Sequence, residues 1–433
     1  MKITTKCRVC GNKNLTSVIN LGEQRLSGVF PHPNSPQPSK SPLELIRCDK
    51  SKQPSACGLV QLKHSANFDE MYGSTYGYYS SISPTMISHL EGIGDKLLEF
   101  VKPEESDVVL DIGCNDGTLL NYFGGLSLNR VGIDPSSAKF AANFQDDIKV
   151  AYEFFSEGAV RSIIGEKKCR IITSIAMFYD IEDPIDFMKQ ITSLLADNGV
   201  WALELSYFPL LLTNLTYDQI CHEHVTYLAL KDIAFMMKQV GLKILDVSFN
   251  NINGGSFFLI AGHVDEPYKS EKEKINKLIL KEKTLYDPIT YDHFRSRVMA
   301  HRDEIKHFFH LIRESGKKIC GYGASTKGNI VLNFCNIGPE DLPTISDRNP
   351  EKFGLVTPGT GIPIISHEQM REEKPDYLFV LIWHFRKEVI EFELEFLAQG
   401  GKLVFNLPRL HTVDKNNYNR YLNTTFDELA YPL

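Results

Sequence analysis

The stretch from Val108 to Leu120, VVLDIGCNDGTLL, constrains the fold of this chain more than any other. Positions 108–112 are apolar apart from one aspartate, as in a strand that is covered on both faces. Gly113 and Gly117 remove side chains where the backbone must turn and where a ligand must approach it. The leucines at 119–120 then begin a helical face. The stretch therefore predicts a buried strand, a glycine turn and a helix, which together form a cofactor cradle in parallel sheets.

The glycine spacing differs from the dinucleotide fingerprint G-x-G-x-x-G. The run here is D-x-G-x-x-x-G and starts at Asp111, with Asp116 as a second acid beside the turn. Carboxylates suit a ligand that carries an ammonium group and no phosphate. A second strand, predicted over 130–133, ends at Asp134, where an acid can accept hydrogen bonds from ribose hydroxyls. The alternative is a flavodoxin-like or Rossmann core with an incidental glycine turn.

The two sequences VLDIGCNDG and VGIDPS resemble the first two motifs of the class I S-adenosylmethionine-dependent methyltransferases. That resemblance implies S-adenosylmethionine as cofactor, and segment 177–184 is where such an enzyme usually places adenine or substrate contacts. The candidate cofactor-binding residues are Asp111, Gly113, Asn115, Gly117, Asp134 and Ser174.

Strands and helices alternate through the middle of the chain, which predicts an α/β fold with a doubly wound sheet. The sequence predicts helices over 86–100 and 185–195, strands over 171–174 and 200–205, and a turn over 196–199. Two more strands, over 244–249 and 256–261, would close the sheet in antiparallel fashion, joined by a turn at Asn253-Gly-Gly255.

The composition sets the outer limits of the interpretation. With 433 residues the chain is too long for one core, so two or three domains are expected. A net charge of −7 argues against nucleic-acid binding. Neither a signal peptide nor an apolar run of about 18 residues is visible, so we expect a cytoplasmic protein that does not enter a membrane. Its nine cysteines are then thiols or metal ligands.

Four of these cysteines lie near the N-terminus, at Cys7, Cys10, Cys48 and Cys57. The C-x-x-C turn aims its two sulfurs the same way, and four thiolates close a tetrahedral, structural zinc site. The segment 31–42 is rich in proline and serine and cannot build a core alone, which favours a metal staple. Loss of zinc is expected to lower solubility and not to affect the chemistry. The alternative is free thiols in a small β-ribbon.

Four tyrosines fall between positions 71 and 81, a short polar run that precedes a helix starting near Pro84. Their hydroxyls suit hydrogen bonding to a sugar or to a developing enolate. Alternatively, the rings pack a domain junction.

The segment Tyr217–His224 crowds Cys221, His222, Glu223 and His224. On a helix the two histidines would point to different sides, which makes them poor joint metal ligands, and the motif H-E-x-x-H is absent. A histidine beside a carboxylate can act as a general base near neutral pH. The cluster follows a strand predicted to end on the cofactor side, so a catalytic His224 is favoured over a pair of structural histidines.

After a charged helical connector with a break at Asp287-Pro288, a second α/β unit starts at 318–328. Its glycine turn carries Ser325, Thr326 and Lys327, and amides at a helix N-terminus with hydroxyls and a lysine suit a phosphate. Later strands are predicted over 377–382 and 400–405. A nucleotide diphosphate fits this unit best, and the alternative is a structural domain with an empty crevice.

Over nearly its whole length the chain resembles the sugar C-methyltransferases that act on nucleotide-linked 4-keto-6-deoxyhexoses. The resemblance rests on the cysteine set, Tyr76-Gly-Tyr78, VLDIGCNDG, the triplet 222–224, NGGS at 253–256 and GYGASTKG at 321–328. It implies a zinc-binding module, a methyltransferase domain with a helical lead-in at 67–100, a connector and a nucleotide-sugar-binding domain, which we place at 1–66, 67–265, 266–315 and 316–433.

The resemblance implies that His224 removes the proton next to the ketone and that Tyr76 lies in the active site. The candidate catalytic residues are His224, Tyr76, Glu223, Cys221 and Asp180, although some family members have a tyrosine at position 221 and a histidine at 180. The candidate substrate-binding residues are Tyr78, His222, Asn253, Ser256, Tyr322, Ser325, Lys327, Asn329, Arg348, Lys352 and His384.

The expected reaction is methylation of a carbon next to the ketone. We expect the protein to be a monomer or a homodimer. The alternatives are an O- or N-methyltransferase and an inactive methyltransferase fold that serves as a binding protein.

Overall fold

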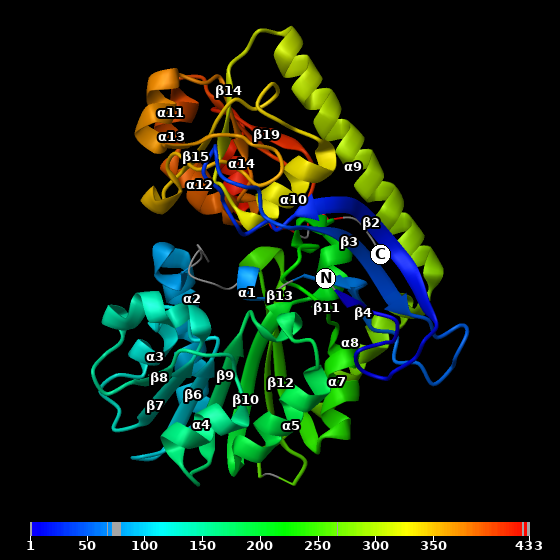
Figure 1. Cartoon of the computed structure of the whole chain (residues 1–433), viewed down its shortest axis with the longest axis vertical. Helices are drawn as coiled ribbons and strands as arrows, with labels where there is room; N and C mark the ends of the chain where they lie inside the picture. The colour runs from blue at the N-terminus through cyan, green and yellow to red at the C-terminus, as the bar shows by residue number, and fades with distance from the viewer. Residues whose placement is uncertain (1, 67, 72–78, 266, 427, 431–433) are drawn as a thin grey trace.

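The structure is a computed structural model that describes residues 2–66, 68–71, 79–265, 267–426 and 428–430. A central lobe and a C-terminal lobe, each built on an α/β sheet, lie at opposite ends of the molecule, and an N-terminal module lies between them (Figure 1). The α/β fold class predicted from the sequence is confirmed.

The central lobe contains a seven-stranded sheet in the order β12-β13-β10-β9-β6-β7-β8, in which β13 alone runs antiparallel to its neighbours. Its strands are β6 (Val108–Ile112), β7 (Asn129–Ile133), β8 (Lys149–Ala151), β9 (Cys169–Ile175), β10 (Leu195–Ser206), β12 (Leu242–Asn250) and β13 (Ser256–His263). Its α-helices are α1 (Phe68–Met71), α2 (Pro84–Val101), α3 (Thr118–Tyr122), α4 (Glu157–Ile164), α5 (Pro184–Leu194), α6 (Phe208–Thr213) and α7 (Leu230–Gln239). Short 3₁₀ turns are η1 (Ser80–Ile82), η2 (Pro135–Asn143), η3 (Phe178–Asp180), η4 (Tyr217–Gln219) and η5 (Ile252–Gly254).

Strand β6 is covered on both faces, as its apolar sequence requires. Val109 packs in one apolar cluster with Leu90 and Leu97 of α2. Val108 and Leu110 belong to the other cluster, which includes Met188 of α5. Helices therefore cover the sheet on two sides, and the carboxyl ends of its parallel strands point to one edge.

One local prediction was wrong. The turn expected over 196–199 is part of β10, where a register shift between Leu195 and Val200 takes up the extra residues. The segment 217–224 is not a helix, because after η4 the chain continues without regular structure to Val225. Side chains in this segment are therefore placed by individual contacts and do not follow helical periodicity.

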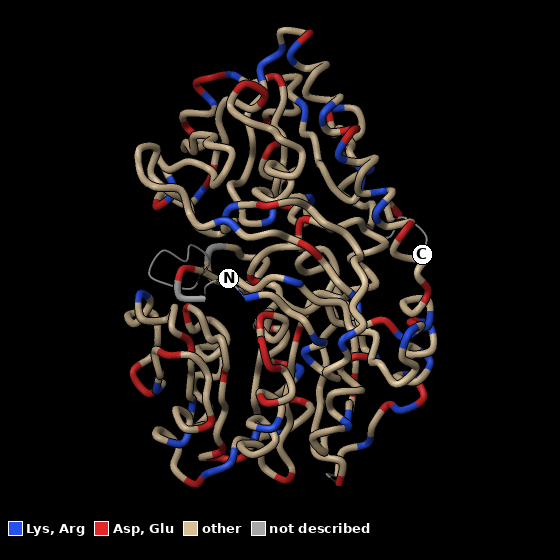
Figure 2. Tube along the Cα trace, turned by 45° about the vertical axis from the view of Figure 1, so that its right-hand side comes forward, with Lys and Arg blue, Asp and Glu red and all other residues tan. Residues whose placement is uncertain are grey.

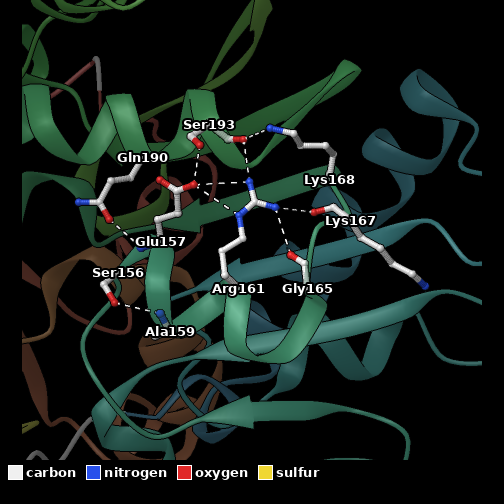
Figure 3. A network of polar contacts seen from close by, with 9 residues as sticks. All are labelled: Ser156, Glu157, Ala159, Arg161, Gly165, Lys167, Lys168, Gln190 and Ser193. Carbon is white, nitrogen blue, oxygen red and sulfur yellow. Dashed lines mark hydrogen bonds and ion pairs between the residues drawn. The ribbon is translucent and has the colours of Figure 1, made fainter.

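A polar network holds α4 against α5 (Figure 3). The Arg161 guanidinium donates to the carbonyl oxygens of Gly165, Lys167 and Ser193 at 3.2, 3.0 and 3.1 Å. The Ser193 hydroxyl donates to Glu157 at 2.5 Å. These contacts join the start of α4 to the end of α5 and fix the chain that enters β9.

The C-terminal lobe contains a six-stranded sheet in the order β16-β15-β14-β17-β18-β19. Its strands are β14 (Ile319–Tyr322), β15 (Ile345–Asp347), β16 (Ile364–Ser366), β17 (Tyr377–Val380), β18 (Lys402–Phe405) and β19 (His411–Val413). Its helices are α10 (Thr326–Cys335), α11 (His367–Glu373), α12 (Arg386–Phe392), α13 (Leu394–Ala398) and α14 (Tyr418–Asn423), with the 3₁₀ turns η7 (Pro350–Lys352) and η8 (Trp383–Phe385). The connector consists of α8 (Lys272–Lys281), η6 (Glu282–Tyr286) and the long helix α9 (Pro288–Glu314), with its break at Asp287-Pro288 as expected.

The N-terminal module contains β1 (Lys2–Ile3), β2 (Leu15–Arg25), β3 (Lys40–Cys48), β4 (Val60–Leu62) and β5 (His64–Ser65). Its main sheet has the order β11-β4-β3-β2, and the edge strand β11 (Thr226–Tyr227) comes from the central part of the chain, two residues after His224. The sequence did not predict that a strand from the central part of the chain would add to the N-terminal sheet. This strand ties the N-terminal module directly to the histidine segment.

Acidic and basic residues are interspersed over both lobes (Figure 2). Within the described residues, every helix is either too short or too polar to cross a membrane.

Candidate functional site

One cavity of about 430 Å³ lies between the two lobes. From the central lobe it is lined by residues at the carboxyl ends of β6, β7, β9 and β10, and from the C-terminal lobe by residues that follow β14, β15 and β17. Gly28 and Phe30 of the N-terminal module close one part of its wall. The cavity therefore joins the two glycine turns that the sequence singled out separately.

The turn after β6 is shaped to receive a ligand. Gly113 has φ +78°, and a side chain there would come within 3.1 Å of Met177. Its amide donates to the Ile133 carbonyl at 2.9 Å. Asp134 at the end of β7 accepts hydrogen bonds from the amides of Asn115 at 3.0 Å and Ser136 at 2.6 Å. The turn and the acid are thus held as one unit at the cavity wall.

Asp111 also lines the cavity and is almost fully buried. Burial raises its pKa to about 7, although the Thr173 hydroxyl, which donates to it at 2.6 Å, works in the opposite direction. A carboxylate in this position would be stabilised by a ligand ammonium group. The expected cofactor cradle therefore has an acid at its base and a second acid at its rim.

The C-terminal lobe repeats this arrangement contact by contact. The amide of Gly323, which has φ +85°, donates to the Ser346 carbonyl at 2.8 Å. Asp347 at the end of β15 accepts from the amides of Ala324 and Asn349, both at 2.8 Å. The Ser325 hydroxyl then caps α10 by accepting from the Gly328 amide at 3.0 Å. The N-terminus of α10 and an acid at the next strand end both face the same cavity.

His224 lines the cavity between these two turns, with its ring against that of Tyr179 at a centroid distance of 4.1 Å. Burial is the main cause that lowers its pKa to about 3, and the positive charge of Lys327 lowers it further. The imidazole is therefore neutral at physiological pH, and an anion formed beside it would raise its basicity for accepting a proton.

The cavity that His224 lines is also lined by Cys221, Glu223 and Asp180. Burial raises the pKa of the Glu223 carboxyl and holds that of the Cys221 thiol far above its usual range. The Glu223 Oε2 atom is buried and has no hydrogen-bond partner in the described structure. The thiol is thus uncharged, which excludes it as a nucleophile at neutral pH.

Contacts from both neighbours fix the loop that carries His224. Trp383 of the C-terminal lobe donates its indole N–H to Asp218 at 2.8 Å. The side-chain amide of Gln219 donates to the Asn253 carbonyl at 3.0 Å. On the other side, the Leu62 amide of β4 donates to the Val225 carbonyl at 2.9 Å. The loop is therefore held in place by all three parts of the molecule.

The four N-terminal cysteines lie together, with their sulfur atoms within 4.8 Å of one another. Cys7 and Cys57 are 3.5 Å apart, and Cys10 and Cys48 are 3.4 Å apart. The Asn12 amide donates to Cys48 Sγ at 3.4 Å and so orients one ligand. Four sulfurs at these distances fit a tetrahedral zinc ion with no open position, which makes a structural zinc.

The structure brings most of the predicted site residues to the cavity. Those that line it are Asp111, Gly113, Asn115, Asp134, Asp180, Cys221, Glu223, His224, Asn253, Tyr322, Ser325, Lys327, Arg348, Lys352 and His384. Tyr76 and Tyr78 lie outside the described residues.

Five predicted residues do not line the cavity, and each has another role. Ser174 faces the sheet interior and accepts a hydrogen bond from Trp201 at 3.1 Å. His222 donates to the Ser41 carbonyl at 3.1 Å, which ties the loop to β3. Ser256 donates to the Ile252 carbonyl at 2.9 Å, and Asn329 donates to the Ser27 carbonyl at 2.8 Å. Gly117, with φ +80°, turns the chain into α3 against Phe144.

Sequence reasoning missed three acids of the cavity wall, Asp347, Glu204 and Glu388. Asp347 could have been found, because it ends the second strand of its sheet as Asp134 does in the other lobe. Glu204 gave no local signal, since its partners His89 and Asn250, at 2.7 and 2.6 Å, are distant in the chain.

Three family models match the chain in succession. A zinc-binding domain matches residues 7–72, a methyltransferase domain matches 86–247, and a C-methyltransferase C-terminal domain matches 251–408. The first of these agrees with the cysteine cluster, and together they confirm the expected zinc.

The chain is 28% identical over 408 residues to the C-methyltransferase NovU of Streptomyces niveus, which covers 93% of this chain and 95% of that protein. Similar solved structures include the plantazolicin methyltransferase BpumL with S-adenosylhomocysteine (SAH) and a triazolic desmethylPZN analog, at 14% identity and a TM-score of 0.34, covering 43% of this chain and 88% of that one. Another is the 1,6-didemethyltoxoflavin-N1-methyltransferase of Burkholderia thailandensis with S-adenosylhomocysteine, at 12% identity and a TM-score of 0.32, covering 48% and 96%.

Proposed function

We propose that this chain is an S-adenosylmethionine-dependent C-methyltransferase whose substrate is a nucleoside diphosphate-linked 4-keto-6-deoxy sugar. The proposed site of methylation is the ring carbon next to the ketone, C3. The observation that carries the proposal is the single cavity in which two glycine-turn ligand sites face each other with His224 between them.

A C-methyltransferase must generate a carbon nucleophile, because a C–H bond does not attack a sulfonium unaided. A ketone beside that carbon lowers the barrier, since the carbanion is then an enolate whose charge can be held by hydrogen-bond donors. S-adenosylmethionine, when bound, supplies the electrophilic methyl group. The enzyme must therefore hold a base, an enolate-stabilising group and two ligands in one water-poor cavity.

His224 is the proposed base. Its imidazole is neutral because burial and the Lys327 charge depress its pKa, so it need not lose a proton before it acts. The Tyr179 ring against one face and the three-sided support of its loop limit its orientation. The other proposed catalytic residues are Glu223, Cys221, Asp180 and Tyr76, of which Tyr76 lies outside the described residues.

The cofactor is proposed to bind at the turn after β6. The cradle fits it because a side chain at Gly113 would fill the space beside Met177, and because Asp111 and Asp134 offer carboxylates to the ammonium group and the ribose. Asn115 lines the same space.

The nucleotide diphosphate is proposed to bind at the turn after β14. The amides at the N-terminus of α10 and the Ser325 and Thr326 side chains line the cavity there, which suits phosphate oxygens. By analogy with Asp134, Asp347 would accept hydrogen bonds from a ribose. Tyr322, Arg348, Lys352, His384 and Asn253 complete the proposed substrate wall.

Mass spectrometry with a substrate panel tests this function. The protein is incubated with S-adenosylmethionine and 4-keto-6-deoxy sugars linked to dTDP, GDP or CDP, and the products are examined for a gain of one methyl group. NMR of the product separates a new carbon-bound methyl from an O- or N-methyl group. Calorimetry with S-adenosylmethionine separates an enzyme from an inactive binding protein, and a panel that yields no methylated sugar would reject the proposed substrate class.

A further inference from the structure

Lys327 differs from the other cations of the cavity. Arg348 forms an ion pair with Glu388 at 2.9 Å, and Lys352 lies 3.5 Å from Asp347 and donates to the Ala324 carbonyl at 2.7 Å. Among the described residues, no carboxylate lies within ion-pair distance of the Lys327 ammonium group. Of these three cavity-lining cations, Lys327 is the one whose charge remains available for an anion.

The Lys327 side chain reaches away from its own helix N-terminus. It starts in the first turn of α10, but its ammonium group donates to the Asn253 side-chain oxygen at 3.2 Å and to the Asn253 carbonyl at 3.5 Å. Asn253 belongs to η5 in the central lobe and accepts from Gln219, five residues before His224. The ammonium group therefore lies against the central-lobe wall of the cavity, one hydrogen-bonded residue away from the loop of the proposed base.

Electrostatics agree with this position. The Lys327 charge adds to burial in lowering the pKa of His224 and of His384, which also lines the cavity. Burial lowers the pKa of Lys327 itself, and the nearby Asp218 carboxyl counteracts that shift. The charge of Lys327 is thus close enough to be felt by an anion formed next to His224.

We propose that the Lys327 ammonium group donates a hydrogen bond to the ketone oxygen of the substrate and stabilises the enolate that His224 creates. This rests on the proposed function. The proton of the ring carbon moves to the His224 imidazole, the C–H pair becomes the carbon–carbon double bond, and the carbonyl π pair moves to the oxygen beside Lys327. When the carbon takes the methyl group, the carbonyl re-forms, the sulfur keeps the pair of the broken C–S bond, and Lys327 remains protonated.

The neighbouring groups are poorer donors for this task. A thiol such as that of Cys221 is a weak hydrogen-bond donor, and a carboxylate such as Asp180 accepts and does not donate. An enolate between Lys327 and His224 would also offset the repulsion that the ammonium group exerts on the imidazolium. Lys327 would then be a catalytic residue and not a phosphate ligand.

The variant Lys327→Met separates these two roles. The wild type and the variant are compared on whichever nucleotide-linked keto sugar of the panel the wild type accepts. Methyl transfer gives kcat and KM. Deuterium uptake at the carbon next to the ketone, in D2O with S-adenosylhomocysteine in place of the methyl donor, reports enolate formation alone. Lys387→Met is the matched control, since the Lys387 side chain is 73% exposed on α12.

Loss of one oxyanion donor lowers kcat about 10²–10³-fold in enzymes, and we expect Lys327→Met to lower both kcat and deuterium uptake on that scale. KM should change by less than about threefold, and Lys387→Met should behave as the wild type. A raised KM with kcat and deuterium uptake retained would overturn the inference and make Lys327 a phosphate ligand.

A second variant, Lys327→Arg, keeps the charge and should retain more deuterium uptake than Lys327→Met; equal loss in both would also contradict the inference. Calorimetry with S-adenosylmethionine shows that each variant keeps a folded central lobe. A wild type that methylates no member of the panel would refute the proposed function, whereas an active wild type with an equally active Lys327→Met would refute only the role of Lys327.

Discussion

Replacing Arg8 with methionine tests how firmly the N-terminal module holds the loop that carries His224. Arg8 lies between two zinc ligands, and its side chain is only 4% exposed. Its guanidinium donates to Gln61 Oε1 at 3.2 Å and to the Leu62 carbonyl at 2.7 Å, both on β4. It also reaches Glu182 of the central lobe at 3.3 Å. A single buried cation therefore joins the zinc knuckle, the strand that pairs with β11, and the segment after Asp180.

The free-energy cost of Arg8→Met follows from these contacts. Leaving the buried Leu62 carbonyl without its charged donor costs about 1–3 kcal/mol. The ion pair adds about 1 kcal/mol, because the Glu182 side chain is 27% exposed and keeps Lys2 and Ser65 as partners. A total of about 2–4 kcal/mol raises the population of the locally opened state about 10–10³-fold, at one factor of ten for each 1.4 kcal/mol. Although burial raises the pKa of Glu182, Arg8 and other partners hold it below its usual value, so its carboxylate would lose its main counter-charge.

Hydrogen exchange measured by mass spectrometry on peptides that cover β4 and β11 reports this opening. Lys2→Met is the matched control, because Lys2 pairs with the same Glu182 at 3.6 Å but is 74% exposed. Such exposed pairs contribute about 0–1 kcal/mol. Zinc content measured by mass spectrometry must be the same in both variants. If Arg8→Met accelerates exchange less than tenfold, or no more than Lys2→Met, the reasoning about the loop support is refuted.

Three further outcomes are expected. Binding of S-adenosylmethionine, measured by calorimetry, should be about tenfold weaker at pH 5.5 than at pH 7. Asp111 has a pKa of about 7, so below that pH its carboxyl is mostly protonated and no longer attracts the ligand ammonium group, which stays protonated in this range. The pH dependence should vanish in Asp111→Asn. Cys57→Ser should lower both zinc content and turnover, since the Val225 carbonyl depends on β4; full turnover without zinc would instead support the first expectation that zinc serves solubility alone. Trp383→Phe should destabilise the protein by about 1–3 kcal/mol in denaturant titrations, because buried Asp218 then loses the one side-chain donor that it has among the described residues. An unchanged midpoint would contradict this.

The elements that the sequence predicted well are those whose cause is local. The strand, turn and helix around Gly113 follow from a run of apolar residues and from glycines with positive φ, so a short window determines them. The cysteine set was equally clear because thiolates at that spacing have few other uses. Likewise, the acid at the end of β7 follows from where a strand stops.

The features that the sequence could not predict depend on residues far apart in the chain. Arg8 and Glu182 are 174 positions apart, and Lys327 and Asn253 are 74 apart. A lysine beside a glycine turn therefore predicted a phosphate contact, whereas the structure directs its ammonium group to the other lobe. Ser174 shows the same limit, because side chains alternate along a strand and this one faces Trp201.

The most direct test of the account is methyl transfer by His224→Asn at saturating substrate, with binding of S-adenosylmethionine measured in parallel by calorimetry. We expect turnover to be lost while the affinity for S-adenosylmethionine stays within about threefold, because His224 packs against Tyr179, whereas the Gly113 turn is held by Ile133 and Asp134. A His224→Asn variant that methylates the sugar at the wild-type rate would contradict the central claim that this imidazole generates the carbon nucleophile.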